Sequence, residues 1–307
     1  MEGCLLAGFA MGAHVAYIYI RGEFIREAAN LQTAIDEAYA AGLLGKDACG
    51  SGWAFDLYLH RGAGAYICGE ESSLLESIEG KRGLPRHKPP YPFQVGLFGL
   101  PTLINNIETL WWVRDIVEQG ADWWKRHGRN DRHGLRSYSV SGRVNNPGMK
   151  LAPAGITVRE LIEEFCGGMA DGHVFHAYLP GGASGGILPA SMDDIPLDFG
   201  TLEKYGCFIG SAAVIVLSEQ DSVKGAALNL MRFFEDESCG QCTPCRVGTQ
   251  KAALLMQQPV WNRELLDELS QAMRDASICG LGQAASNPLS SVIKYFPEEL
   301  LPKEAAE

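Results

Sequence analysis

Basic side chains are scarce relative to acidic ones in this chain of 307 residues. It contains 26 Lys and Arg against 37 Asp and Glu, which gives a formal net charge of -11 at pH 7. Such a charge opposes electrostatic binding to nucleic acid or to an anionic membrane surface, so neither is expected as a partner. With 46% hydrophobic residues, the chain still has enough apolar mass for a folded core.

The sequence also lacks a recognisable secretory or membrane-spanning segment. The stretch Gly3 to Ile20 has no Lys, Arg, Asp or Glu, but it contains Gly8, Gly12 and His14 and is shorter than about 20 strongly apolar residues. We expect a buried helix followed by a buried strand there, and no direct membrane insertion. The nine cysteines are an odd number without regular disulfide spacing, which favours a reducing, cytoplasmic compartment.

The first 130 residues alternate strand and helix patterns, which predicts a partial Rossmann-like α/β domain with a largely parallel sheet. Strands are expected over 14–20 and 55–60, with a helix over 24–41 between them. The glycine-rich segment RGAGAYICG (61–69) then leads into a helix near Glu70, and ligands of α/β sheets sit at such turns. Residues 85–101 are too rich in proline and glycine for regular structure, and a turn and helix are expected over 103–117.

Two further regions follow a polar, glycine-flanked boundary at 128–134. Strand patterns over 137–144, 149–152, 174–179 and 208–217, with a capping box at Thr157 and Glu160, predict an α+β roll such as a β-grasp domain over 137–218. The loop 180–186 in it is either flexible or close-packed. Residues 219–307 predict a helical bundle, with helices at 222–236, 244–257, 262–275 and near 288–296, and with Thr243 and Asn262 as N-caps.

Three cysteines recur at a strict interval in ESCGQCTPCRVGT (237–249), namely Cys239, Cys242 and Cys245. This spacing with a distant fourth cysteine suits a [4Fe–4S] cluster, and Cys279 in the same helical region is the candidate fourth ligand. A zinc site is the alternative, although no histidine follows His176. Buried unligated thiols are the remaining alternative. The other five cysteines are expected to be buried core thiols: Cys4, Cys49, Cys68, Cys166 and Cys207.

The residues around this motif suit a negatively charged cluster. A helix that begins at Pro244 would direct the positive end of its dipole at the site, and Arg246 and Lys251 would add positive potential. Arg246 could equally be a solvated helix residue. Elsewhere, Glu70 and Glu71 could be ordinary first-turn acidic residues, and Asn105 and Asn106 a turn and helix cap.

Four stretches together resemble one family: 62–92, 99–110, 237–249 and 277–288. They are similar to the flavoprotein, NADH-oxidising subunit of respiratory complex I, soluble NAD-reducing hydrogenases and NAD-dependent molybdenum formate dehydrogenases. The resemblance covers essentially the whole chain. It implies an α/β domain that binds FMN and NAD, a β-grasp domain, and a helical bundle with one [4Fe–4S] cluster.

The resemblance also implies roles for individual residues. Gly69, Glu70 and Glu71 match the family's Gly-Glu-Glu along the flavin and the nicotinamide, and Tyr66 matches an aromatic residue near the nicotinamide. Tyr91 matches the aromatic residue on which adenine stacks. Two further groups match by position: an FMN-contacting pair at Asn105 and Asn106, and the cluster ligands Cys239, Cys242, Cys245 and Cys279. No acid–base dyad is expected, because the cofactors carry the hydride chemistry.

The chain departs from the family at its start. The family's glycine-rich loop and acidic segment precede the point that aligns with Met1, so we expect an N-terminally truncated version or part of a split protein. Residues 280–283 resemble the formate dehydrogenase and hydrogenase branch of the family more than complex I, and residues 180–199 most resemble the β subunit of formate dehydrogenase. The resemblance then implies two partners, a small [2Fe–2S] thioredoxin-like subunit and a larger iron–sulfur subunit that holds molybdenum.

Three alternatives remain open. The chain could be the corresponding subunit of NADH-quinone oxidoreductase or the diaphorase subunit of an NAD-reducing hydrogenase. It could be a truncated, non-catalytic interaction module that bears only the cluster. It could also be a structural domain stabilised by zinc.

Overall fold

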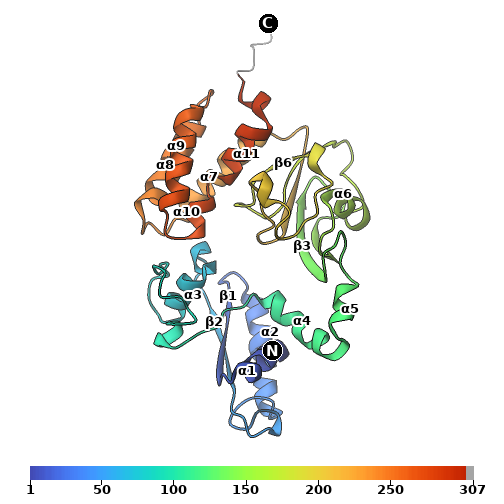
Figure 1. The fold of residues 1–307 in the computed structure, drawn as a ribbon, viewed down its shortest axis with the longest axis vertical. Coiled ribbons are helices and arrows are strands. Elements are labelled where there is room, and N and C mark those ends of the chain that lie inside the picture. The colour runs from blue at the N-terminus through green and yellow to red at the C-terminus, as the bar shows by residue number, and fades with distance from the viewer. Residues whose placement is uncertain (302–307) are drawn as a thin grey trace. The chain divides into compact units, whose positions relative to one another are not determined.

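The computed structural model describes residues 1–301. They divide into two compact units, unit 1 from Met1 to Ala121 and unit 2 from Asp122 onward (Figure 1). Within residues 1–301, no helix combines the length and the apolar character needed to cross a bilayer.

Unit 1 contains a two-stranded parallel sheet, as the alternation of strand and helix patterns predicts. Val15 of β1 pairs with Asp56 of β2, and Ile20 pairs with Arg61. Its core joins the inward side chains Ile18 and Leu57 with Ile35 of α2. The elements of unit 1 are α1 (Glu2–Met11), β1 (Val15–Ile20), α2 (Ile25–Ala40), β2 (Asp56–Arg61), α3 (Glu71–Ile78) and α4 (Ile107–Gln119), and α5 (Ala121–Lys125) follows.

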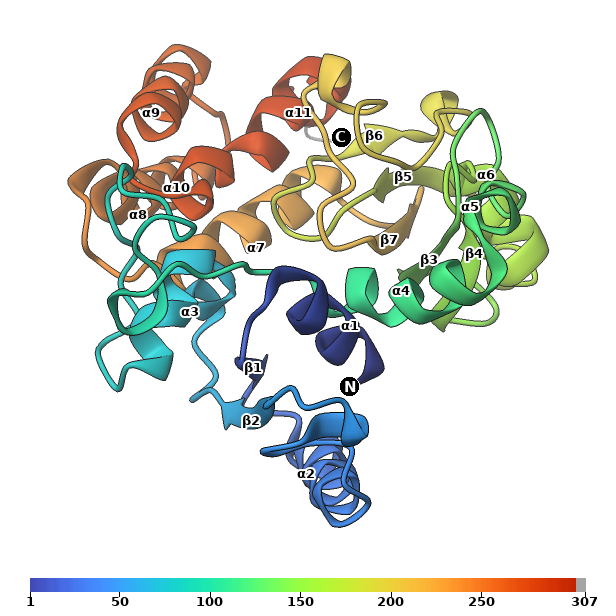
Figure 2. The ribbon, with the colours of Figure 1, turned by 60° about the horizontal axis from the view of Figure 1, so that its bottom comes forward.

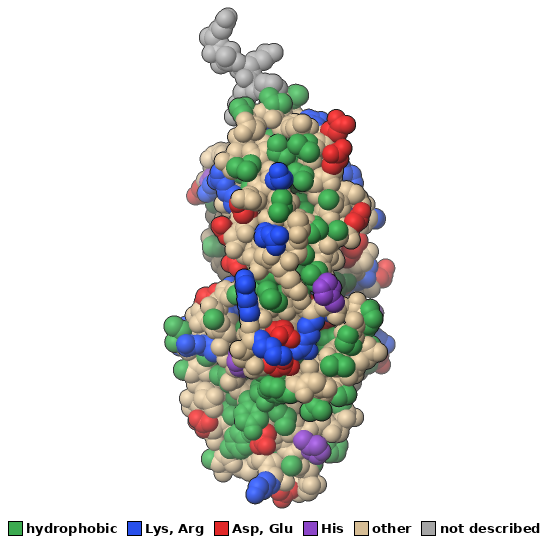
Figure 3. Space-filling model, turned by 90° about the vertical axis from the view of Figure 1, so that its left-hand side faces the viewer, with side chains coloured by type: hydrophobic (Ala, Val, Ile, Leu, Met, Phe, Trp, Pro, Cys, Tyr) green, Lys and Arg blue, Asp and Glu red, His purple; other side chains and the backbone are tan. Residues whose placement is uncertain are grey.

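The prediction of a buried first strand is wrong in part. Val15 and Tyr17 on β1 are exposed, and Tyr17 stacks on Tyr58 of β2 with ring centroids 5.3 Å apart. The reason is that α2 packs against the face with Ile18 and Leu57, while alternate residues of the same strands point to the other face. In α1 only three small residues are buried: Gly3, Cys4 and Gly8. Large exposed apolar side chains are visible in the space-filling view (Figure 3).

Unit 2 begins with a five-stranded mixed sheet in the order β4-β3-β7-β5-β6. β3 runs parallel to β7, and the other neighbouring pairs are antiparallel. The predicted capping box is confirmed, because Thr157 and Glu160 exchange both hydrogen bonds at the start of α6. The elements are β3 (Leu135–Gly142), β4 (Gly148–Pro153), α6 (Val158–Glu160) followed by a π-helix (Leu161–Phe165), β5 (Phe175–Leu179), β6 (Leu188–Pro189) and β7 (Ala213–Ser218).

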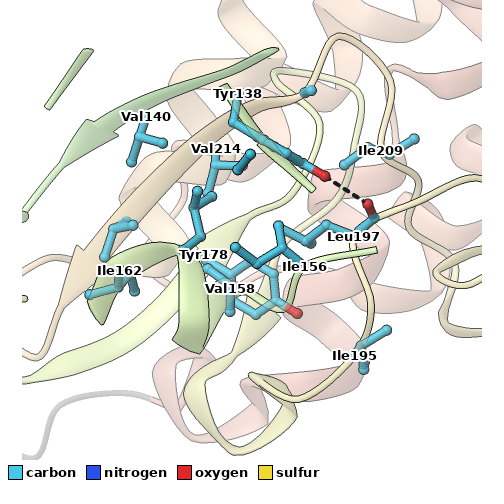
Figure 4. Packing of buried hydrophobic residues seen from close by; sticks show 14 of the residues in the cluster. Tyr138, Val140, Ile156, Val158, Ile162, Tyr178, Ile195, Leu197, Ile209 and Val214 are labelled. Carbon is cyan, nitrogen blue, oxygen red and sulfur yellow. Dashed lines mark hydrogen bonds between the residues drawn. The ribbon is translucent and has the colours of Figure 1, made fainter. Parts of the chain in front are cut away.

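One face of this sheet packs on α6 and the loops around it. Tyr138, Val214 and Val158 are fully buried in this core (Figure 4). The hydroxyl of Tyr138 donates to the carbonyl oxygen of Leu197 at 3.1 Å, so the buried polar group is satisfied.

After the sheet, the described residues contain five α-helices. They are α7 (Val223–Asp236), α8 (Thr243–Met256), α9 (Arg263–Ala276), α10 (Gly280–Ala284) and α11 (Asn287–Tyr295). Asn262 caps α9 as predicted, by accepting from the backbone N–H of Leu265. Thr243 is not the cap of α8, because the helix begins one residue earlier than expected and Cys242 takes that position.

The helices cover the second face of the sheet. Ile215 and Leu217 of β7 pack with Ala227 and Met231 of α7, whereas Val214 and Val216 of the same strand point into the first core. Figure 2 shows α7 and α11 beside β7, β5 and β6. The sequence predicted that the loop 180–186 is either flexible or close-packed. It is close-packed, because most of its residues are buried.

Four of the five predicted core thiols are buried: Cys4, Cys68, Cys166 and Cys207. Cys49 is exposed, so its predicted burial is wrong. It lies in a short turn with φ of 55°, where the backbone directs its side chain away from the core that holds its neighbour Ala48.

Candidate functional site

The four candidate ligand cysteines lie at the starts of two helices of unit 2. Cys242 caps α8, Cys245 lies in its first turn, and Cys239 precedes them in the turn after α7. Cys279 caps α10, which contacts both α8 and α9. The helix contacts therefore bring together the two segments that sequence spacing could only suggest as partners.

The other three thiols affect the ionisation of Cys245. Cys245 is buried, and its burial raises the pKa of the thiol to about 11, with further upward contributions from Cys242, Cys279 and Cys239. A hydrogen bond from Ser238 opposes the rise in pKa. A neutral thiol in the protein alone becomes a thiolate ligand when a metal centre supplies positive charge.

A metal ion and an iron–sulfur cluster require different arrangements of the four thiols. Within residues 1–301, no group of three or more His, Cys, Asp or Glu is positioned to hold one metal ion. A zinc ion requires its ligand sulfur atoms at about 2.3 Å from one centre. A cubane cluster instead takes one thiolate at each of four separate corners.

Arg246 fixes the loop that carries the first cysteines. Its guanidinium donates to the carbonyl oxygen of Gly240 and, at 3.3 Å, to Oγ1 of Thr243. The sequence left two roles open for Arg246, a solvated helix residue or a source of positive potential. The structure adds a third role, because the side chain forms hydrogen bonds within the loop. It holds the turn between Cys239 and Cys242 in shape.

Two serine side chains complete the surroundings of the thiols. The hydroxyl of Ser238 lies 3.4 Å from Sγ of Cys245. The hydroxyl of Ser277 is buried without a hydrogen-bond partner among the described residues. Four partly buried thiols, with serine hydroxyls beside them that can donate hydrogen bonds to sulfur, fit an anionic iron–sulfur cluster.

A second group of candidates lies in unit 1, where β2 leads into α3. The turns after β1 and β2 pass close together, since a Cβ at Gly22 would lie 2.4 Å from the carbonyl oxygen of Gly62. After them, Tyr66 and Gly69 form a short 3-10 turn (Tyr66–Gly69). Ligands of parallel sheets bind at this carboxyl edge.

Glu70 is the N-cap of α3. One of its carboxylate oxygens accepts from the backbone N–H groups of Ser72, at 2.8 Å, and Ser73, at 2.9 Å. Burial raises the pKa of Glu70, but the hydrogen bonds from Ser72, Ser73 and Lys88 outweigh it, so the pKa lies below its ordinary value. The carboxylate is therefore held ionised as an acceptor.

Lys88 joins two predicted site residues, although no sequence pattern connects it with either of them. Its ammonium lies 3.1 Å from Oε1 of Glu70 and also pairs with Glu71. These contacts tie the proline-rich segment to the start of α3. Sequence reasoning missed Lys88, and the only available signal was a cation directly before Pro89 and Pro90.

Arg86 organises the rest of the proline-rich segment. Its guanidinium donates to Glu76, to Glu79 at 3.0 Å and to the carbonyl oxygen of Gly96 at 3.1 Å. Glu79 in turn accepts from the backbone N–H of Phe98 at 2.8 Å. Arg86, Glu76, Glu79 and Gly96 line a pocket of about 320 Å³ in unit 1.

The remaining candidates are exposed. Tyr91 stacks on Phe93 with ring centroids 5.6 Å apart and is 45% exposed. Asn106 caps α4 by accepting from the backbone N–H of Glu108 at 2.8 Å, and its neighbour Asn105 is exposed. Tyr66 is 40% exposed. Figure 3 shows acidic and basic side chains intermingled on one face of the molecule rather than a field of one sign.

Comparison with known proteins gives these two groups a family context. The family model for the NADH-ubiquinone oxidoreductase-F iron-sulfur binding region matches residues 225–303. The Nuo51 FMN-binding domain matches 1–115, and the SLBB domain matches 137–188. The F subunit of NADH-quinone oxidoreductase from Rickettsia rickettsii is 45% identical over 98% of this chain and 73% of its own length.

The chain belongs to the family of NADH-quinone oxidoreductase F subunits. A mitochondrial member from Neurospora crassa, the NADH-ubiquinone oxidoreductase 51 kDa subunit, is 48% identical over 98% of this chain and 62% of its own length. The F-subunit family is of the NADH dehydrogenase type, and FMN, a [4Fe–4S] cluster and NAD are its cofactors.

A solved structure shares the mixed α/β fold of this chain. The H2-reduced NAD+-reducing [NiFe]-hydrogenase matches with a TM-score of 0.86 and 36% sequence identity, over 97% of this chain. The chain spans 50% of that hydrogenase chain.

Proposed function

We propose that this chain is the electron-transfer subunit of an NAD-dependent oxidoreductase complex, with NAD(H), FMN and one [4Fe–4S] cluster. The observation that carries the proposal is the meeting of Cys239, Cys242 and Cys245 with Cys279 between α8 and α10. When bound, the flavin links the two-electron chemistry of the nicotinamide to the one-electron chemistry of the cluster.

The proposed cluster ligands are these four cysteines. The N-terminal end of α8 carries the positive end of the helix dipole, which stabilises an anionic cluster. Arg246 keeps the ligand loop in shape through Gly240 and Thr243. Preorganised ligands lower the ordering cost of binding.

The proposed flavin and nicotinamide contacts are in unit 1: Tyr66, Gly69, Glu70, Glu71, Tyr91, Asn105 and Asn106. Glu70 supports its assignment best, since its depressed pKa keeps it ionised near neutral pH and able to accept from ribose hydroxyls. Tyr91 offers an exposed ring for stacking with a base. The protein's task is to align the two cofactors, which requires positioning rather than acid–base chemistry.

We further propose three parts within the fold: an FMN- and NAD-binding α/β domain over 1–130, a β-grasp domain over 137–218, and a cluster-bearing helical bundle over 219–307. The separate hydrophobic clusters in unit 1, beneath the sheet of unit 2, and among its helices support this division. The nine cysteines, an odd number without regular disulfide spacing, support a reducing, cytoplasmic setting.

The partner complex is proposed from two stretches. Residues 180–199 favour a formate dehydrogenase, with a small [2Fe–2S] subunit and a larger molybdenum subunit, and residues 280–283 fit either a formate dehydrogenase or a hydrogenase. The relatives named above instead include subunits of complex I and of an NAD+-reducing hydrogenase. Affinity purification of the tagged chain from its native cell separates these cases: a molybdenum subunit, a membrane arm or a nickel–iron subunit would be recovered with it.

One experiment tests the cofactors of the proposed function. The chain is purified anaerobically, and iron, sulfide, zinc and flavin are measured together with NADH–ferricyanide activity. About four irons per chain, flavin and activity support the proposal. Four irons without flavin would favour a non-catalytic cluster-bearing module, and zinc without sulfide would favour a structural zinc domain.

A pair of variants tests the ligand assignment. Cys242→Ser removes a proposed ligand, so we expect loss of most of the iron and sulfide. Cys49→Ser is the matched control, since Cys49 is also solvent-accessible but lies in unit 1, and it should keep the wild-type iron content. Equal iron content in the two variants would contradict the assignment.

A further inference from the structure

Ser277 has a buried hydroxyl with no hydrogen-bond partner among residues 1–301. The residue is 6% exposed. It is the C-cap that follows α9, two positions before Cys279. A buried hydroxyl without a partner is costly, so native proteins rarely retain one without a reason. The hydroxyl of Ser277, between α9 and α10, can therefore donate a hydrogen bond to an acceptor that the described part of the chain does not supply.

The position of Ser277 is defined by its neighbours. A Cβ added at Gly282 of α10 would lie 2.4 Å from Oγ of Ser277 and 2.8 Å from Cβ of Cys245. The hydroxyl and the buried cysteine are thus close neighbours on the same side of α10. The carbonyl oxygen of Ser277 is held separately, by Nε2 of Gln283 at 3.0 Å, so the loop around the hydroxyl is fixed.

Ser238 provides an internal comparison. Its hydroxyl lies 3.4 Å from Sγ of Cys245, and its oxygen accepts from the backbone N–H of Gly240 at 3.3 Å. Because that oxygen already accepts, its own proton is available to the sulfur. One serine thus already contacts sulfur from the α7–α8 loop, and Ser277 approaches the same cysteine from the α9–α10 loop.

We propose that the Ser277 hydroxyl donates a hydrogen bond to a sulfur atom of the bound [4Fe–4S] cluster and raises the cluster's reduction potential. The inference rests on the proposed function, because it requires a cluster on the four cysteines. Reduction adds one negative charge to the cluster, so a donor to sulfur stabilises the reduced form more than the oxidised form. Burial strengthens such a bond because little water competes for it.

The test uses Ser277→Ala in the full chain, with Ser270→Ala as the matched control. Ser270 is also a buried serine of α9, but its hydroxyl already donates to the carbonyl oxygen of Leu266 at 2.7 Å. Each protein is reconstituted anaerobically, its iron and sulfide are counted, and the reduction potential is measured by an EPR-monitored titration. We expect Ser277→Ala to lower the equilibrium constant for one-electron reduction by roughly tenfold, which is about 59 mV. Ser270→Ala should not change it.

A second readout separates this role from a structural one. In the cluster-free chain, Ser277→Ala removes an unpaired buried hydroxyl, so its free energy of unfolding should be unchanged or higher. A structural hydroxyl would instead give a clear loss of stability. A variant with wild-type iron content and wild-type potential overturns the inference.

Two further outcomes are decisive. A wild-type chain that takes up no iron or sulfide overturns the proposed function, and the inference with it. If Ser277→Ala cannot hold a cluster, the wild-type reduced cluster is examined by proton ENDOR in H2O and D2O. A strongly coupled exchangeable proton that persists when Ser238→Ala removes the other serine donor supports the inference, and its absence overturns it.

Discussion

Replacing Gly282 with alanine should disturb the cysteine site more than its small size suggests. The added Cβ would lie 2.4 Å from Oγ and 2.7 Å from Cβ of Ser277, and 2.8 Å from Cβ of Cys245. All three contacts are far shorter than van der Waals separation. The Ser277 hydroxyl can rotate, but the Cβ atoms of Ser277 and Cys245 cannot, so α10 must shift relative to α8.

The free energy has two opposing contributions. Overpacking of a close-packed site costs roughly 1–3 kcal/mol, whereas replacing a helical glycine with alanine gains about 1 kcal/mol in helix propensity. Gly280→Ala is the matched control in the same helix, because a Cβ there meets no atom within 4 Å. The propensity gain largely cancels between the two variants. Gly282→Ala should therefore be the less stable by about 1–3 kcal/mol in its free energy of unfolding.

The assay is urea unfolding of both cluster-free variants, followed by anaerobic reconstitution and a count of iron and sulfide per chain. We expect Gly282→Ala to take up less iron than Gly280→Ala, since the shift separates Cys279 from Cys245. Equal stability and equal iron content would refute the argument that Gly282 sets the approach of the two ligand segments.

Two more predictions concern stability away from the cysteines. Burial raises the pKa of Glu79, but hydrogen bonds from Lys81, Phe98 and Arg86 outweigh it and lower the pKa from 4.5 to about 2. Its carboxylate therefore stabilises the fold above pH 4.5 and loses this contribution as the pH falls toward 2. In urea unfolding across that range, Glu79→Gln should flatten the acid dependence, and an unchanged slope would exclude this role. Thr157→Ala breaks the capping box of α6 and should cost about 1 kcal/mol by the same assay. Glu160→Ala added to it should cost little more, and full additivity would contradict a reciprocal box.

Local sequence signals predicted much of the secondary structure. The helix expected over 222–236 is observed as Val223–Asp236, because its apolar spacing and the cap at Ser222 agree. The parallel pairing of β1 and β2 followed from the helix between them. The spacing of Cys239, Cys242 and Cys245 likewise needed no tertiary information to indicate a metal site.

What the sequence could not predict depends on contacts between distant residues. α10 is only five residues long, too short for a periodic pattern to emerge. The ion pairs of Lys88 with Glu70 and Glu71 join residues 18 and 17 positions apart, respectively. Nothing local marks Ser277 as buried, because serine is mostly an exposed residue.

Strand β7 contributes side chains to two hydrophobic cores, so the parts of unit 2 depend on one another for folding. Val214 and Val216 belong to one hydrophobic core, and Ile215 and Leu217 contact the other. A single inserted or deleted residue in this strand would exchange its faces and spoil both cores together. The helices that carry the four cysteines should therefore not fold when expressed alone, because the strands that form one side of their hydrophobic core would be missing.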